Sequence, residues 1–195
     1  MSILNEIGKR VLLFDGGTGT VLQSRGLKPG ELTESFNLLH PEIITELHGE
    51  YLAAGCDIVK TNTFGANGIK AAEHGYDLEK TVAAGVKCAR SAVIKNKKGY
   101  VALDIGPTGK LLKPLGDLDF ETAVEAFAKT VRAGSGDADL ILIETFSDLY
   151  EAKAAVVAAK ENCDLPIFVT FTFNDDGRLM TGADAACVAA AAACA

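Results

Sequence analysis

Short apolar runs alternate along the chain with longer segments whose apolar residues recur at helical spacing. The runs are rich in Val, Ile, Leu and Phe and show little polar alternation, which is typical of parallel strands buried on both faces. They predict five strands, at residues 11–14, 57–60, 100–103, 140–143 and 166–173.

The segments between these runs carry helix start signals. Pro41 suits a first helical turn, and Asp77 and Asp119 each precede an apolar pattern of helical period. Asp148, with Glu151 three positions later, predicts a capping box. An alanine-rich segment over 183–195 predicts a last helix. Strand–helix alternation of this kind indicates an α/β domain with a parallel sheet.

Two architectures fit this alternation, a doubly wound sheet and an eight-stranded barrel. Every predicted strand ends in polar residues, and such ends converge on one rim only in a barrel. The pattern therefore favours a (β/α)8 TIM barrel. A complete barrel needs roughly 250 residues, whereas this chain has 195. We expect about the first five β/α units, forming one partial barrel domain over residues 1–195.

Composition and charge narrow the class of protein. The net charge is −7, with both signs intermixed, which argues against nucleic-acid or anionic-membrane partners. No apolar run is long enough to span a membrane and no signal peptide is recognisable, so we expect a cytoplasmic protein. The five cysteines form no Cys-x-x-Cys pair, which indicates structural roles. Cys187 and Cys194 are expected on one side of the last helix.

The glycine-rich segment at residues 12–20, LLFDGGTGT, does not fit a nucleotide loop. Leu22 stands where a dinucleotide fingerprint needs its third glycine, and the second strand ends without an acidic residue. A second candidate, residues 104–110, lacks the first glycine of a phosphate loop and the Ser or Thr that should follow Lys110. Both nucleotide motifs are rejected.

Two carboxylates remain as candidate ligands. Asp15 either lies at the rim beside the backbone amides of Gly16 and Gly17, or caps the following turn. Glu144 ends a very apolar strand, so its carboxylate must meet water, a cation or hydrogen-bond donors. Two carboxylates on one rim suit an ammonium group, such as that of a free amino acid. Asp104, at another strand end, either bonds within the rim or contacts a ligand.

The three histidines carry no metal signal. His40, His48 and His74 are separated by spacings that place them on no common face. We expect surface or capping positions for all three.

At this point the chain resembles the homocysteine S-methyltransferase family. The resemblance is carried, in order, by LLFDGGTGT, Glu34-Ser35-Phe36-Asn37, His40-Pro41, AGCDIVKTNTFG, GPTGKLLKPLGDLDF and LILIETFSDLYEAKAA. It covers essentially the whole chain. Within the family it is nearest to the N-terminal homocysteine-binding domains of cobalamin-dependent methionine synthases.

The resemblance implies a (β/α)8 barrel that binds homocysteine and zinc and serves methionine biosynthesis. Zinc would hold the substrate sulfur as a thiolate, which takes a methyl group from methylcobalamin or another donor. By the same resemblance, Asp15 and Glu144 would hold the amino group of homocysteine. The residues that would line the pocket and meet its carboxylate are Gly16, Gly17, Thr61, Asn62 and Thr63.

The departure from the family lies in the metal site. The family's zinc ligands are three cysteines in motifs that do not occur here, and none of the five cysteines matches them. We therefore expect no metal ligand and no catalytic residue in this chain, and no methyl transfer by the chain alone. The alternative is a non-catalytic fragment, or a small amino-acid-binding domain without methyl transfer.

The expected partners follow from the open sheet edges of a partial barrel. The rest of the barrel, a second copy, or the segment 183–195 lying across the gap would cover them. A cobalamin-binding domain is a further expected partner.

Overall fold

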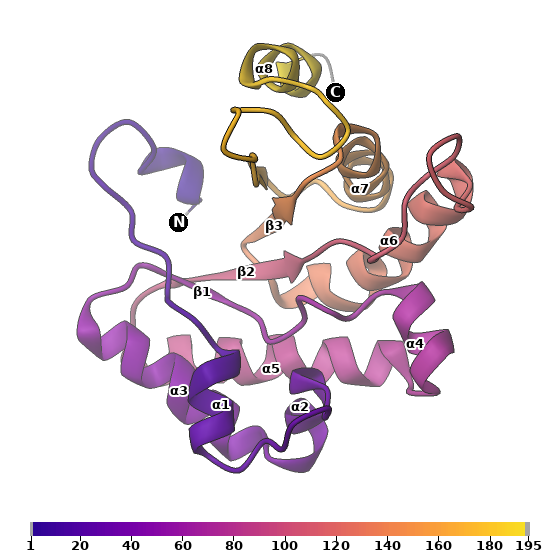
Figure 1. Cartoon of the computed structure of the whole chain (residues 1–195). Helices are drawn as coiled ribbons and strands as arrows, with labels where there is room; N and C mark the ends of the chain where they lie inside the picture. Colours follow the sequence, from indigo (N-terminus) through magenta and orange to yellow (C-terminus); the bar gives the residue numbers. More distant parts are fainter. Residues whose placement is uncertain (1, 194–195) are drawn as a thin grey trace.

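The computed structural model describes residues 2–193 and shows a parallel α/β fold (Figure 1). A four-stranded sheet has the order β1-β2-β3-β4, and each neighbouring pair is parallel. The strands are β1 (Ile58–Lys60), β2 (Tyr100–Ile105), β3 (Leu140–Phe146) and β4 (Ile167–Phe171). Sequential strands are therefore neighbours, as the strand–helix alternation predicts.

The α-helices are α1 (Gly19–Ser24), α2 (Phe36–Leu39), α3 (Pro41–Ala54), α4 (Gly68–His74), α5 (Leu78–Asn96), α6 (Phe120–Gly134), α7 (Leu149–Asn162) and α8 (Ala185–Ala193). Three short 3₁₀ turns are η1 (Ile3–Asn5), η2 (Thr33–Ser35) and η3 (Ser135–Asp137). Helices α3, α5, α6 and α7 pack side by side in chain order around one side of the sheet (Figure 1).

The first predicted strand, at residues 11–14, is reduced to one isolated bridge between Phe14 and Ile58. Val11 and Leu13 are 79% and 54% exposed, so this run is not buried on both faces. Backbone bonds from Asp15 to Ile58 and from Asp57 to Leu13 still align the segment with β1. It lies in the first-strand position without forming a regular strand.

Two polar residues expected after their strands lie inside them. β2 continues through Ile105 and β3 through Phe146, so Asp104 and Glu144 are strand residues. β3 changes register between Ile143 and Phe146. At this irregularity Thr145 has φ +67°, which is unusual for a β-branched residue. Glu144 is therefore presented from a distorted end of β3.

The two faces of the sheet are covered differently. On the helix side, Val59, Leu103 and Ile143 join a large core with α5, α6 and α7. On the other side, Ile58, Ala102, Leu140 and Leu142 pack beneath Ile3 of η1, with Leu12, Phe14, Tyr100 and Phe168 at the edges. The N-terminal segment thus covers the amino-end half of the inner face, whose carboxyl-end half is polar.

The helix starts agree largely with their sequence signals. Pro41 is the first residue of α3, and Asp77 and Asp148 accept backbone bonds from Lys80 and Tyr150 as N-caps of α5 and α7. The expected capping box at α7 is wrong in its second half. Glu151 instead accepts two bonds from Thr108 in the loop after β2.

The last helix does not cross the open inner face. Ala191 and Ala192 of α8 lie with Val156 of α7 and with Val169 and Phe171 of β4, which belong to the helix side. In Figure 1, α8 lies next to α7. For the described residues 183–193, the expectation that this segment lies across the gap is wrong, because α8 borders the cavity on the helix side of β4. Cys194 lies outside the described residues.

Candidate functional site

The strand period places three charged side chains on the inner face. Side chains two positions apart share a face, so Lys60 follows Ile58, Asp104 follows Ala102 and Glu144 follows Leu142. The order β1-β2-β3 puts Asp104 on the strand between the other two. An apolar inner face thus ends in a charged layer, which we call the acid cluster: Asp15, Lys60, Asp104 and Glu144.

Asp15 joins this cluster from the segment beside β1. Its backbone N–H donates to Ile58 O at 3.0 Å, and its Oδ2 accepts from the Lys60 N–H at 3.1 Å. The residue is 7% exposed and its Oδ1 is buried without a protein partner. Burial raises the pKa of Asp15 to about 7, although the bond from Lys60 and the lysine charge oppose the rise. Such a carboxyl group is poised to accept a cation or donor.

Lys60 reaches across β2 to Glu144. Its Nζ donates to both Glu144 oxygens at 3.2 Å, and both side chains are 19% exposed. Burial alone would lower the pKa of Lys60, but the charges of Glu144, Asp104 and Asp15 raise it. The ammonium is therefore charged and forms the counter-ion of the cluster.

Asp104 is buried in the middle of the cluster, with 4% exposure. Burial, and then the charge of Glu144, raise the pKa of Asp104 well above its ordinary value. Its Oδ1 is also buried without a protein partner. Three carboxyl groups thus share one ammonium, and the raised pKa values of Asp15 and Asp104 favour protons on these two groups, which a second bound cation would displace.

The glycines beside Asp15 pack against α3. A Cβ on Gly16 would lie 3.0 Å from the Tyr51 hydroxyl oxygen, and that hydroxyl donates to Gly17 O at 2.8 Å. The two glycines are exposed. The structure therefore leaves this backbone accessible beside the buried Asp15 carboxyl group.

The segment Thr61-Asn62-Thr63 has structural partners. Thr61 Oγ1 accepts from the Asp104 N–H at 3.0 Å, and Thr63 Oγ1 donates to Asp104 O at 2.7 Å. The Asn62 amide donates to Thr33 O and to Asn37 Oδ1. The threonines hold β2 where it carries Asp104, whereas the Asn62 side chain turns toward η2 and α2. The structure brings Asp15 and Glu144 together through Lys60, whereas the hydrogen bonds of the Asn62 side chain go to η2 and α2.

Two members of this neighbourhood were missed by sequence reasoning. Lys60 could have been found as a lysine at the end of an apolar strand, two positions after Ile58 and therefore on the same face of the sheet. His48 lies in the apolar stripe of α3, with 0% exposure, so the surface or capping expectation for it is wrong. His48 Nδ1 is 3.9 Å from Asp15 Oδ2, which is longer than a hydrogen bond. Burial lowers the pKa of His48 to about 4, so the imidazole is neutral and the contact is not an ion pair.

The zinc implied by the family resemblance does not fit the described residues. Between residues 2 and 193, no three His, Cys, Asp or Glu side chains are grouped so that they could hold a metal ion. Cys56, Cys88, Cys163 and Cys187 are free thiols. We therefore assign no metal ligand in this part of the chain.

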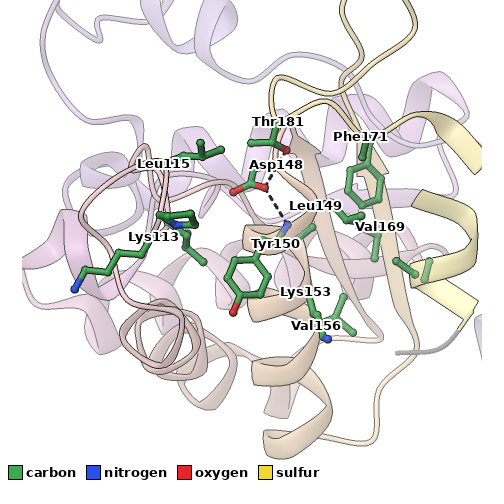
Figure 2. Close-up of a pocket in the computed structure, with 16 residues that line it drawn as sticks. Lys113, Leu115, Asp148, Leu149, Tyr150, Lys153, Val156, Val169, Phe171 and Thr181 are labelled. Carbon is green, nitrogen blue, oxygen red and sulfur yellow. Dashed lines mark hydrogen bonds between the residues drawn. The ribbon is translucent and has the colours of Figure 1, made fainter. Parts of the chain in front are cut away.

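The large cavity of Figure 2 is separate from the acid cluster. It measures about 600 Å³ and lies between α7, α8, β4 and the loop at 112–115. Its strand residues, Val169 and Phe171, belong to the helix side of the sheet. Asp148 there accepts bonds from Tyr150 and Thr181. The small alanine side chains of α8 leave this space open, and most of its lining is apolar, with Lys113, Asp148 and Lys153 as its charged residues.

Comparison with known proteins places the chain among methyltransferases. A family model described as homocysteine S-methyltransferase matches residues 12–195. The fold is similar to that of the homocysteine methyltransferase MmuM from Escherichia coli. With the oxidized form the TM-score is 0.86 at 24% identity, over 97% of this chain and 72% of that chain. With the metallated form the TM-score is 0.84 at 23% identity, over 97% of this chain and 73% of that chain.

These likenesses confirm the predicted fold class, an α/β fold of barrel type with part of its units in this chain. Among the described helices, none is long and apolar enough to cross a membrane.

Proposed function

Because the chain belongs to the homocysteine S-methyltransferase family, matched over residues 12–195, we propose that it supplies the homocysteine-binding part of a methyltransferase. In the proposed reaction the substrate sulfur accepts a methyl group and the product is methionine. The observation that carries the proposal is the acid cluster, where two buried carboxyl groups each keep an oxygen without a protein partner. A substrate ammonium would satisfy them.

The roles proposed for single residues follow from position. Asp15 and Glu144 hold the substrate ammonium, since carboxylates form their strongest hydrogen bonds with charged donors. The exposed backbone at Gly16 and Gly17 lies next to Asp15 and can approach the ligand closely. Thr61, Asn62 and Thr63 are proposed to line the pocket, and their hydrogen bonds support a role in holding the segments that frame it.

The methyl donor and the metal are proposals that rest on family membership. When bound, zinc would keep the substrate sulfur as a thiolate at neutral pH, and methylcobalamin would supply the methyl group. The described residues include no group of three side chains that could hold a metal ion. We therefore assign no step of the reaction to zinc or to methylcobalamin. The remaining barrel segment, or a second copy, and a cobalamin-binding domain are proposed partners, in the cytoplasm.

One alternative function is favoured by a specific observation. The described residues offer carboxyl groups for an amino group but no three ligands for zinc. A domain that binds an amino acid without methyl transfer fits that set as well. Production of labelled methionine from homocysteine and a methyl donor, by the chain combined with the remaining barrel segment and zinc, separates the two functions.

Calorimetric titration with L-homocysteine tests the site. Asp15→Asn and Glu144→Gln each remove a carboxylate facing the ligand ammonium, and each should weaken binding by roughly tenfold or more. The matched control is Asp164→Asn, an exposed acid before β4 at the opposite end of the sheet. Unchanged affinity in both site variants, or equal loss in the control, would reject the site.

A further inference from the structure

The Lys60–Glu144 pair raises a question of charge. Glu144 is proposed to hold the substrate ammonium, yet in this structure its two oxygens already accept from the Lys60 ammonium. A substrate that binds there must share Glu144 with Lys60 or replace it.

The geometry of the pair favours replacement. Both Nζ–O distances are 3.2 Å, longer than the roughly 2.7–2.9 Å of a tight charge-assisted bond. The lysine side chain keeps 19% exposure, and its flexible stem carries three donors that can reorient. The pair is loose enough for Lys60 to leave Glu144 while staying in the cluster.

The other end of an amino acid also needs a partner. Its carboxylate would be brought close to Asp15, Asp104 and Glu144, and like charges at this range repel unless a cation lies between them. Lys60 is the cation that acts on both Asp15 and Asp104. Its Nζ lies 3.2 Å from Glu144, the proposed partner of the substrate ammonium. In an α-amino acid the carboxylate is attached to the same carbon as the ammonium, so it would lie near Lys60.

We propose that Lys60 is a specificity-determining residue, which holds Glu144 in the free protein and passes to the ligand carboxylate when the ligand ammonium takes its place. The site would then accept zwitterionic α-amino acids and discriminate against amines that lack the carboxylate. This role rests on the proposed function. It adds discrimination between ligands with and without a carboxylate, which Asp15 and Glu144 alone do not provide.

The test compares two ligands by calorimetry, L-homocysteine and homocysteamine, which is the same thiol without the carboxylate. The wild-type protein should bind homocysteine roughly tenfold or more tightly, as expected for a bond between charged groups. In Lys60→Met, homocysteine should bind roughly tenfold more weakly. Homocysteamine should bind as tightly as before or more tightly, because Lys60 no longer competes with its ammonium for Glu144. Lys60→Arg should keep the preference, and Lys95→Met, an exposed change on α5, should alter neither affinity.

The outcomes separate the two proposals. Equal weakening of both ligands in Lys60→Met means a structural ion pair and overturns the role of Lys60, while the proposed function stands. Equal affinities in the wild type overturn that role even if the methionine variant fails to fold. Failure of the wild type to bind either ligand rejects the proposed function, and the role of Lys60 with it.

Discussion

At the scale of single residues, Asp15 combines a candidate binding role with a folding cost. Its carboxyl group is buried beside neutral His48 of α3, the backbone of Lys60 and the charge of Glu144. Burial raises the pKa of Asp15 from the ordinary 3.8 to about 7. The folded chain therefore holds this proton more tightly than the unfolded chain. The resulting stability is fully present below about pH 4 and is lost as the pH rises through about 7.

Asp15→Asn should remove this dependence. The free energy of unfolding of the variant, relative to wild type, should rise between pH 5 and pH 8 by up to about 3 kcal/mol, because about two pH units of this window lie below the folded pKa of about 7. Urea denaturation at several pH values measures it. His48 acts in the opposite direction, since its pKa is lowered to about 4, and its contribution is present above about pH 6.5 and lost below. It remains in both proteins, so it largely cancels in the difference. A difference that does not change with pH would contradict the burial argument.

At the scale of elements, a buried glutamate ties a loop to a helix. Glu151 of α7 is 4% exposed, and its Oε1 accepts from Thr108 N at 2.8 Å and Thr108 Oγ1 at 2.5 Å. Burial raises the pKa of Glu151, and the two bonds from Thr108 oppose the rise. The loop after β2 is thereby held against the first turn of α7.

Glu151→Ala should therefore destabilise the fold by about 2–4 kcal/mol, because two buried donors of Thr108 lose their acceptor. Glu151→Gln keeps an acceptor oxygen and should cost about 1 kcal/mol. Lys153→Ala, an exposed change on the same helix, should stay within about 0.5 kcal/mol of wild type. Urea denaturation checks all three. Equal loss in the alanine and glutamine variants would show that the negative charge of Glu151, and not an acceptor oxygen as such, carries the effect.

At the scale of the whole molecule, the sheet has an open side. β4 pairs with β3 alone within the described chain, and its residues are half-buried or exposed. α8 borders the cavity on the helix side of β4, and no described strand pairs with the outer edge of β4. Unpaired edges of apolar strands favour association.

We expect the purified protein to associate, with a second copy or with a bound remainder of the barrel. Sedimentation velocity at several concentrations measures this. Thr170→Lys places a charge at an exposed position of β4 and should shift the protein toward monomer, whereas Lys95→Thr on α5 should not. A well-folded wild-type chain that stays strictly monomeric would contradict the expectation.

The sequence by itself determined the parts of this protein that depend on local interactions. Strand–helix alternation predicted the α/β class, and Pro41, Asp77 and Asp148 predicted helix starts, because a cap or first-turn residue acts within a few positions of itself. The apolar runs located all four regular strands. They also predicted a strand at residues 11–14, where the structure has one bridge.

Only the tertiary structure decided which side chains meet. The bond from Thr108 to Glu151, the burial of His48 beside Asp15, and the reach of Lys60 across β2 to Glu144 all join residues far apart in the chain. Such contacts depend on strand register and on the helices that pack between them. A change of one residue in register would turn Lys60 to the opposite face. The residue types at the candidate site were visible in the sequence, but their charge balance exists only in the folded protein.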